Sequence, residues 1–328
     1  MNVTRARTNN RTNNRTNNRT NGMDRGGHGK MNNRVLLKSL PGIATADGDG
    51  VKLTRIIGSP QLNILDPFLL LDCFESDDAQ DYIGGFPTHP HRGFETVTYL
   101  LNGRMRHKDN AGHEGVIESG GVQWMTAGKG IMHSEMPEQD EGLLKGFQLW
   151  VNLPASAKMS EPVYQEFPPE ATALERRDNG IEIRVIAGET SEGTRGPVVN
   201  EYTYPTYMDI TLPVGTVIEQ ALPVGHNAFV YVIDGEISVL DNANVPSKTL
   251  SAKALGVLDK GVLDKSVLAQ GALDQSDQVS LKSGSQGARV LLIAGKPLNE
   301  PVARGGPFVM NTKAEIMQAY EDFNSGKF

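Results

Sequence analysis

The sequence predicts an all-β protein in which short antiparallel strands pack as a sandwich or barrel. The 36 glycines and 18 prolines interrupt short apolar segments, and few long stretches have helical periodicity. Many of these segments follow one another closely between residues 94 and 153. Asn102-Gly103 and Asp234-Gly235 are dipeptides typical of tight hairpin turns. At 328 residues, the chain has enough surface to bury for two domains.

The N-terminal segment, residues 1–34, is expected to be a disordered tail. Residues 7–22 repeat Arg-Thr-Asn-Asn and offer nothing apolar to bury. The segment has eight Lys or Arg and one acid, whereas residues 35–328 have 24 and 38. An organellar targeting peptide, an RNA-binding arm, and a start codon placed upstream of a true start at Met23 or Met31 remain alternatives.

The first half of the chain is expected to contain nine strands separated by Gly, Pro and Asp turns. Asn102-Gly103 should join two of them as a type I′ hairpin. The expected strands cover residues 35–37, 51–57, 68–74, 94–100, 104–108, 114–117, 122–126, 131–136 and 147–153.

The second half has a similar layout, which suggests a duplicated domain. Asp234-Gly235 should again form a hairpin, and residues 256–275, four five-residue units, should form an expanded surface loop. A helix is expected over residues 313–324, begun by a capping box of Thr312 and Glu315. The expected strands cover residues 181–186, 208–212, 217–222, 229–233, 236–240, 278–281 and 289–293.

Two pairs of metal-ligand residues lie in the first half, His89 with His91 and His133 with Glu135. Residues i and i+2 of a strand point the same way and lie about 6.5–7 Å apart, so each pair can present two donors to one ion. Three imidazoles and a carboxylate suit a divalent first-row metal. The alternative is that these are scattered polar strand residues. Cys73 is the only cysteine, which argues against a sulfur-rich structural zinc site.

Composition excludes several classes of function. The acidic body gives no reason to expect nucleic-acid binding, and no apolar run is long enough to span a bilayer. No signal-peptide core is present, so a cytoplasmic protein is the default expectation. Cys73 should be a buried small side chain, and His107, His113 and His226 lack a donor partner two residues away that would make a comparable pair.

Three long strings carry a resemblance to a known family. They are His-Pro-His-Arg-Gly-Phe-Glu-Thr-Val at 89–97, Gln-Trp-Met-Thr-Ala-Gly-Lys-Gly-Ile-Met-His-Ser-Glu-Met-Pro at 123–137, and Gly-Gly-Pro-Phe-Val-Met-Asn-Thr at 305–312. All three strongly resemble the pirin family of the cupin superfamily. The likeness extends from about Val35 to the C-terminus, whereas the tail and the five-residue repeats depart from the family pattern.

The resemblance implies a bicupin, with two β-sandwich or barrel cupin domains and a short C-terminal helix. The expected boundaries are 35–165 for the metal-binding domain, 166–298 for the second domain without metal, and 299–328 for the C-terminal segment. The family's four metal ligands fall on His89, His91, His133 and Glu135, while Glu95 should lie just behind the ligands.

The resemblance also implies a chemistry. Similar proteins bind iron, and several resemble quercetin 2,3-dioxygenases, in which a flavonol loses its 3-hydroxyl proton and dioxygen opens the central ring with release of carbon monoxide. One divalent ion is therefore expected, Fe(II) foremost, although Zn, Ni, Mn or Cu suit the same donors. Glu135 would be both ligand and catalytic base. The alternative is a non-enzymatic, redox-sensitive iron protein that regulates a protein partner.

Overall fold

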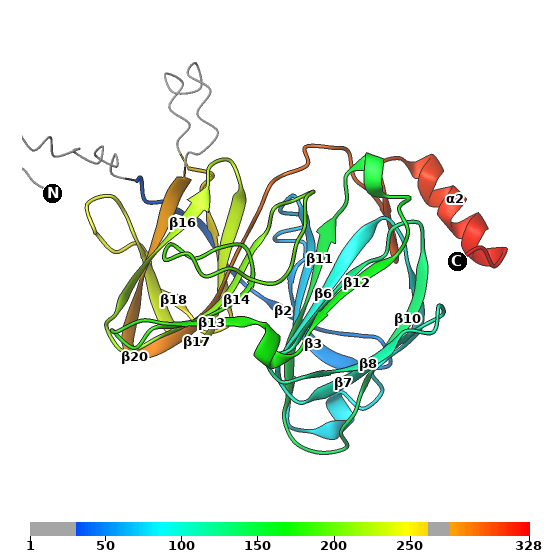
Figure 1. Cartoon of the computed structure of the whole chain (residues 1–328), viewed down its shortest axis with the longest axis horizontal. Helices are drawn as coiled ribbons and strands as arrows, with labels where there is room; N and C mark the ends of the chain where they lie inside the picture. The colour runs from blue at the N-terminus through cyan, green and yellow to red at the C-terminus, as the bar shows by residue number, and fades with distance from the viewer. Residues whose placement is uncertain (1–30, 262–275) are drawn as a thin grey trace, which may run out of the picture. The chain divides into compact units, whose positions relative to one another are not determined.

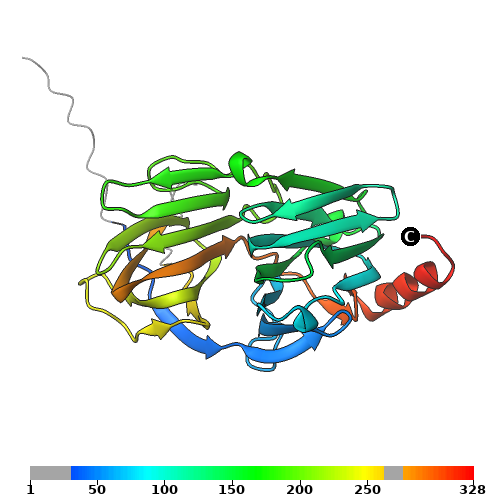
Figure 2. The ribbon, with the colours of Figure 1, turned by 90° about the horizontal axis from the view of Figure 1, so that it is seen from below.

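The computed structural model describes residues 31–261 and 276–328. The side chain of Ser276 is not part of this description. The predicted disordered tail, except for its last four residues, and most of the five-residue repeats lie outside the described residues. From Asn32 to Phe328 the chain forms one compact unit, which consists of two β-rich halves followed by a C-terminal segment (Figures 1 and 2).

The first half consists of two antiparallel sheets. A four-stranded sheet has the order β5 (Phe86–His91), β10 (Ile131–Pro137), β7 (Arg104–Asp109) and β8 (Glu114–Glu118). A seven-stranded sheet has the order β12 (Val163–Phe167), β9 (Val122–Thr126), β6 (Phe94–Asn102), β11 (Leu144–Asn152), β4 (Phe68–Ser76), β3 (Val51–Ile57) and β2 (Ile43–Asp47).

The second half is built on one nine-stranded sheet. Its main order is β1 (Leu36–Pro41), β19 (Ala254–Leu258), β17 (Asn227–Leu240), β20 (Ser276–Gly295), β15 (Thr206–Leu212), β14 (Glu182–Ala187) and β13 (Ala173–Arg176). Two more strands, β16 (Val217–Pro223) and β18 (Leu250–Ser251), pair with β20 and β17. The first strand of the chain therefore belongs to the sheet of the second half, while β2 belongs to the first (Figure 2).

The C-terminal segment returns to the first half. It forms the hairpin of β21 (Ala303–Gly305) and β22 (Phe308–Met310), followed by α2 (Lys313–Asn324) (Figure 1). The predicted capping box is confirmed, because the Thr312 side chain accepts from the Glu315 backbone and the Glu315 side chain accepts from the Thr312 backbone. Three 3-10 helices complete the described structure: η1 (Ala79–Asp81), η2 (Ala155–Ala157) and η3 (Pro169–Ala171).

Neither of the two predicted hairpins is present in the described structure. In the described structure β6 and β7, which flank Asn102-Gly103, lie in different sheets and do not pair with each other. Asp234-Gly235 lies inside the single strand β17, where the pairing with β20 shifts on either side of Gly235. Gly103 and Gly235 have φ of 92° and 75°, so each dipeptide does supply the left-handed backbone of a sharp bend. The bend moves the chain to another sheet or kinks a strand.

The loop expected at residues 256–275 also requires a correction at its start. Gly256, Val257 and Leu258 belong to β19, and their side chains or backbone are buried against β1 and β17. The Gly-Val-Leu residues of the first repeat unit are apolar, so they can form a strand where a neighbouring sheet edge is available. The whole repeat is therefore not a surface loop. Most of the other expected strands are found with ends that differ by a few residues.

Two clusters form most of the core. One lies where the seven-stranded and nine-stranded sheets face each other, with edge-on ring contacts of Phe68 with Phe229 at 5.3 Å and of Phe147 with Tyr231 at 5.5 Å. The other consists of 21 buried residues inside the second half, almost all aliphatic. The corresponding cluster between the two sheets of the first half has eight buried residues, which leaves room for the cavity described below.

Candidate metal centre

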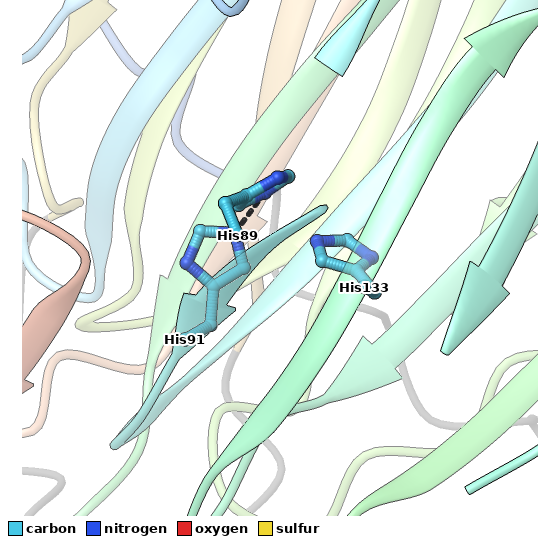
Figure 3. Close-up of side chains that lie close together, drawn as sticks. All are labelled: His89, His91 and His133. Carbon is cyan, nitrogen blue, oxygen red and sulfur yellow. Dashed lines mark hydrogen bonds between the residues drawn. The ribbon is translucent and has the colours of Figure 1, made fainter. Parts of the chain in front are cut away.

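Three of the four predicted ligands meet on neighbouring strands of the four-stranded sheet. His89 and His91 alternate along β5 and share one face, and His133 on β10 lies directly opposite His89 in the antiparallel register. One ring nitrogen from each of the three histidines lies within 4.8 Å of the others. Figure 3 shows the three rings grouped, with a dashed line at the 3.0 Å approach of His89 Nε2 to His91 Nε2.

The surroundings of His91 and His133 keep these two imidazoles in the form that binds metals. His91 and His133 are 3% and 1% exposed. Burial is the main cause that lowers the pKa of both side chains well below 6.5, and the neighbouring imidazoles lower it further. A neutral imidazole retains a nitrogen lone pair for a metal ion.

Several of these nitrogens have no hydrogen-bond partner in the described structure. Both ring nitrogens of His133 and Nδ1 of His91 are buried without a hydrogen-bond partner. Buried polar atoms are rarely left unpaired, and coordination of an ion is one standard way in which such nitrogens are satisfied. The residues present therefore fit a divalent metal ion.

Glu135, the fourth predicted ligand, lies outside this group of three. The pairing of β10 with β5 shifts between His133 and Glu135, whereas β10 keeps a regular register with β7 through both residues. Its carboxylate is 2.7 Å from Thr98 Oγ1 through Oε1 and accepts from Gln148 Nε2 at 3.2 Å through Oε2. The side chain is 2% exposed, and it lines the same cavity as His89 and His91.

A cavity of about 710 Å³ opens beside the histidines. Trp150 forms part of its wall and packs edge-on against His91 at 5.2 Å and, more nearly parallel, against Phe94 at 4.3 Å. Its lining is mainly apolar and aromatic, with a few charged groups: Asp47, Gly48, Asp49, Leu53, Arg55, Leu70, Asp72, Phe74, Phe86, Pro87, His89, His91, Glu135, Gln148, Trp150, Arg304, Gly306 and Pro307. A concave, mostly apolar pocket of this size with a few polar groups is typical of a small-molecule site.

The other candidate residues lie away from this cavity. Glu95 is on the opposite face of β6 from Thr98, where it accepts hydrogen bonds from Thr126 at 2.8 Å and from Asn200 of the second half at 2.6 Å. Burial raises the pKa of Glu95 to about 7. Glu95 therefore contributes to the contact between the halves, which differs from the position behind the ligands that the resemblance implied.

Three other histidines of the described residues, and the cysteine, lie outside the group of three imidazoles. His107 lies 2.9 Å from Glu166 and His113 lies 3.0 Å from Asp109. Burial lowers the pKa of His226 to about 4, and among the described residues it belongs to no group of three metal-ligand side chains. Cys73 is buried, as predicted.

Sequence reasoning missed most of the cavity lining, including Gln148, Trp150 and Arg304. It also missed Thr98, which donates to Glu135. Gln148 and Trp150 alternate with buried Phe147, Leu149 and Val151 on β11, so their shared face was readable as a pattern of period two. Arg304 directly precedes the Gly-Gly-Pro string at 305–307. Nothing local indicates that this segment, about 170 residues beyond Glu135, returns to the cavity.

The chain is similar to known proteins in both of its halves. Residues 50–151 match the pirin family model, and residues 207–328 match that of the pirin C-terminal cupin domain. A pirin-like protein of Caulobacter vibrioides is 50% identical over 90% of this chain and 99% of its own length. A pirin-like protein of Solanum lycopersicum is 44% identical over 90% of this chain and 92% of its own.

The solved structures agree. A crystal structure of quercetin 2,3-dioxygenase from Acinetobacter baumannii matches with a TM-score of 0.77 and 34% identity, over 90% of this chain and 98% of that one. Within the described residues, no helix has the length and apolar character needed to cross a membrane. The two matched models cover both halves, and the relatives align along nearly their whole length, so the chain belongs to the pirin family and has its two cupin domains.

Proposed function

We propose that this protein is a metal-dependent dioxygenase that cleaves flavonols such as quercetin. His89, His91, His133 and Glu135 hold one divalent ion in the proposal, with Fe(II) as the expected metal. The observation that carries it is that two of the three grouped imidazoles, His89 and His91, line a cavity with aromatic walls. The matched dioxygenase structure from Acinetobacter baumannii supports the same substrate class.

The donor set suits this chemistry. Three nitrogens and a carboxylate oxygen leave coordination positions open on a first-row ion. A divalent ion bound there supplies a Lewis acid that favours loss of the proton from a coordinated hydroxyl. The protein's own contribution is to hold the four donors and to keep the His91 and His133 imidazoles neutral by burial.

Glu135 is the proposed base for the flavonol 3-hydroxyl. Thr98 Oγ1 has one proton but lies 2.7 Å from both Glu135 Oε1 and Gln148 Oε1. When Glu135 accepts a proton, it can donate to Thr98, Thr98 can donate to Gln148, and Gln148 Nε2 can still donate to Glu135 Oε2. These three groups therefore accommodate the transferred proton with every hydrogen bond between them made.

The cavity walls position the substrate. Trp150, Phe74 and Phe86 offer apolar surface to planar rings, and about 710 Å³ falls within the range of small-molecule pockets. We also propose that the protein acts in the cytoplasm. The single cysteine, Cys73, is a buried thiol and forms no disulfide, which is compatible with a reducing compartment.

The decisive variant is Glu135→Gln, whose amide oxygen can still coordinate an ion but whose amide cannot accept the proton. We expect a variant that retains metal to bind quercetin but to turn over about 10²–10⁴ times more slowly. Quercetin absorbance and carbon monoxide release under air, with iron-loaded protein, measure this. Glu189→Gln is the matched control, because Glu189 is an exposed residue paired with Arg195 and does not line the cavity.

Two outcomes would change the proposal. Full turnover by metal-loaded Glu135→Gln would show that Glu135 is a ligand only. The absence of turnover in the wild-type protein, across several flavonols and each of Fe, Ni, Mn and Cu, would reject the enzyme. A protein partner whose affinity depends on the oxidation state of bound iron would then support the regulatory alternative.

A further inference from the structure

The C-terminal segment supplies one wall of the cavity. Arg304, Gly306 and Pro307 line it, although the strands that carry the imidazoles end at Pro137. Three contacts hold this segment against the first half. Val309 N donates to Arg92 O at 3.0 Å, the buried Lys158 Nζ donates to Val309 O at 3.0 Å, and Arg92 forms an ion pair of 2.9 Å with Asp322 of α2. The position of Arg304 is therefore fixed by packing.

Two arginines line the cavity, Arg55 and Arg304. They differ in whether a carboxylate forms an ion pair with the guanidinium. Arg55 donates to Asp72 through two nitrogens, at 2.9 and 2.7 Å, and also pairs with Asp47 at 2.8 Å. Arg304 has no carboxylate within 4.0 Å among the ion pairs of residues 31–261 and 276–328. The only side-chain hydrogen bond of Arg304 in the described structure is a long one of 3.4 Å from Nη1 to Leu69 O. Most of its donors are therefore available to a ligand.

Two ring contacts link Arg304 to the candidate metal centre, a cation–π contact with Trp150 and an edge-on contact of Trp150 with His91. The guanidinium carbon lies 4.9 Å from the centroid of the Trp150 ring, and that ring is 5.2 Å from the His91 ring. The guanidinium is therefore within about 10 Å of His91. Stacking on an indole restrains the planar guanidinium, so it can offer a fixed fork of donors to a planar anion.

We infer that Arg304 binds an ionised oxygen of the substrate, and that the substrate is a planar aromatic molecule with a phenolate or carboxylate remote from the hydroxyl that faces the metal. This inference rests on the proposed function in one respect, that the cavity is the substrate site. It adds a specificity-determining residue from the C-terminal segment. A flavonol with ionisable hydroxyls at its far end belongs to this class, as do other aromatic acids of similar size.

The test uses a pair of ligands that differ in charge and lack the flavonol hydroxyl. Isothermal titration of the full-length, metal-loaded protein compares 2-naphthoate with 2-naphthamide, its neutral analogue. We expect the wild-type protein to bind naphthoate about tenfold more tightly, since a hydrogen bond to a charged group typically contributes this much or more. Arg304→Gln should bring the two affinities within about twofold of each other, and Arg304→Lys should retain part of the preference because it keeps the charge but loses the planar fork.

Arg195→Gln is the control, because Arg195 pairs with Glu189 outside the cavity, and it should retain the full preference. Equal binding of the two ligands by the wild type, or binding of neither, would overturn the inference. A preference that survives in Arg304→Gln would also overturn it, because the carboxylate would then bind elsewhere, for instance to the metal. Failure of the dioxygenase proposal is read separately, from the quercetin and carbon monoxide assay. Normal quercetin turnover without a naphthoate preference would reject only the role of Arg304.

Discussion

The two cupin domains of this chain use their interiors in opposite ways. The second is filled by 21 buried residues, including Ile210, Val230 and Leu292, all fully buried. The first has eight residues in the cluster between its sheets, and the remaining space is the cavity of about 710 Å³ with imidazoles on its wall. The same architecture is therefore filled with apolar side chains in one copy and retains a cavity in the other.

The difference indicates what a binding site costs. Each aliphatic side chain that is fully removed from water contributes roughly 1.5–3 kcal/mol of hydrophobic free energy. Side chains that line a cavity contribute less of this hydrophobic free energy, and buried imidazoles add a desolvation cost. The hydrophobic free energy of the second domain and of the shared cluster between the sheets can offset this loss, because both belong to one compact unit with the first domain.

The largest effect expected from this comparison concerns metal content. His89→Ala combined with His133→Ala should lower the metal bound per chain from about one to near zero, because two of three converging imidazoles are lost. Elemental analysis of purified protein measures it. His226→Ala, in the second domain, is the control and should leave the stoichiometry unchanged. Stoichiometry that stays near one in the double variant would remove the metal assignment from the first domain.

A second prediction compares packing in the two interiors. Ile210→Ala should lower the free energy of unfolding by about 3 kcal/mol, because it leaves a void in a filled core. Leu53→Ala, on the cavity wall, should cost only about 1 kcal/mol, because the side chain already faces open space on one side. Urea unfolding of both variants gives the difference. Equal losses would show that the cavity wall is packed as tightly as the second interior.

A third prediction addresses the contact between the halves. Burial raises the pKa of Glu95 from 4.5 to about 7, so the native protein retains a proton that the unfolded chain loses between these values. Stability should therefore fall as the pH rises from about 4.5 to 7, by at most about 3 kcal/mol. Glu95→Gln should flatten this part of the profile of melting temperature against pH. An unchanged slope would show that Glu95 is ionised throughout, and Glu189→Gln serves as the exposed control.

The smallest effect should come from segments whose composition gives them little apolar surface to bury. Deleting residues 1–30, or removing the single unit 266–270, should shift the melting temperature by no more than a degree or two. Differential scanning calorimetry of the truncated chains tests this. A large loss of stability in the 266–270 deletion would show that more of the repeat is built into the second domain than the part in β19.

Some features of this protein follow from sequence alone, because their physics is local. Alternation along a strand places His89 and His91 on one face wherever the strand lies, and the Thr312 capping box starts α2 at the expected residue. The long strings at 89–97, 123–137 and 305–312 suffice for the family and the two-domain fold.

Tertiary structure decided the rest, because strand partners are chosen by contacts far apart in sequence. Gly103 and Gly235 specify a backbone bend, but the available sheet edges determine whether it becomes a hairpin, a crossing between sheets or a kinked strand. Thr98 and Gln148 on two other strands hold the Glu135 carboxylate, and only the return of β21 brings Arg304 to the same cavity. Turn chemistry and periodicity act over a few residues, whereas the shape and charge of a cavity depend on segments that meet only in the folded protein.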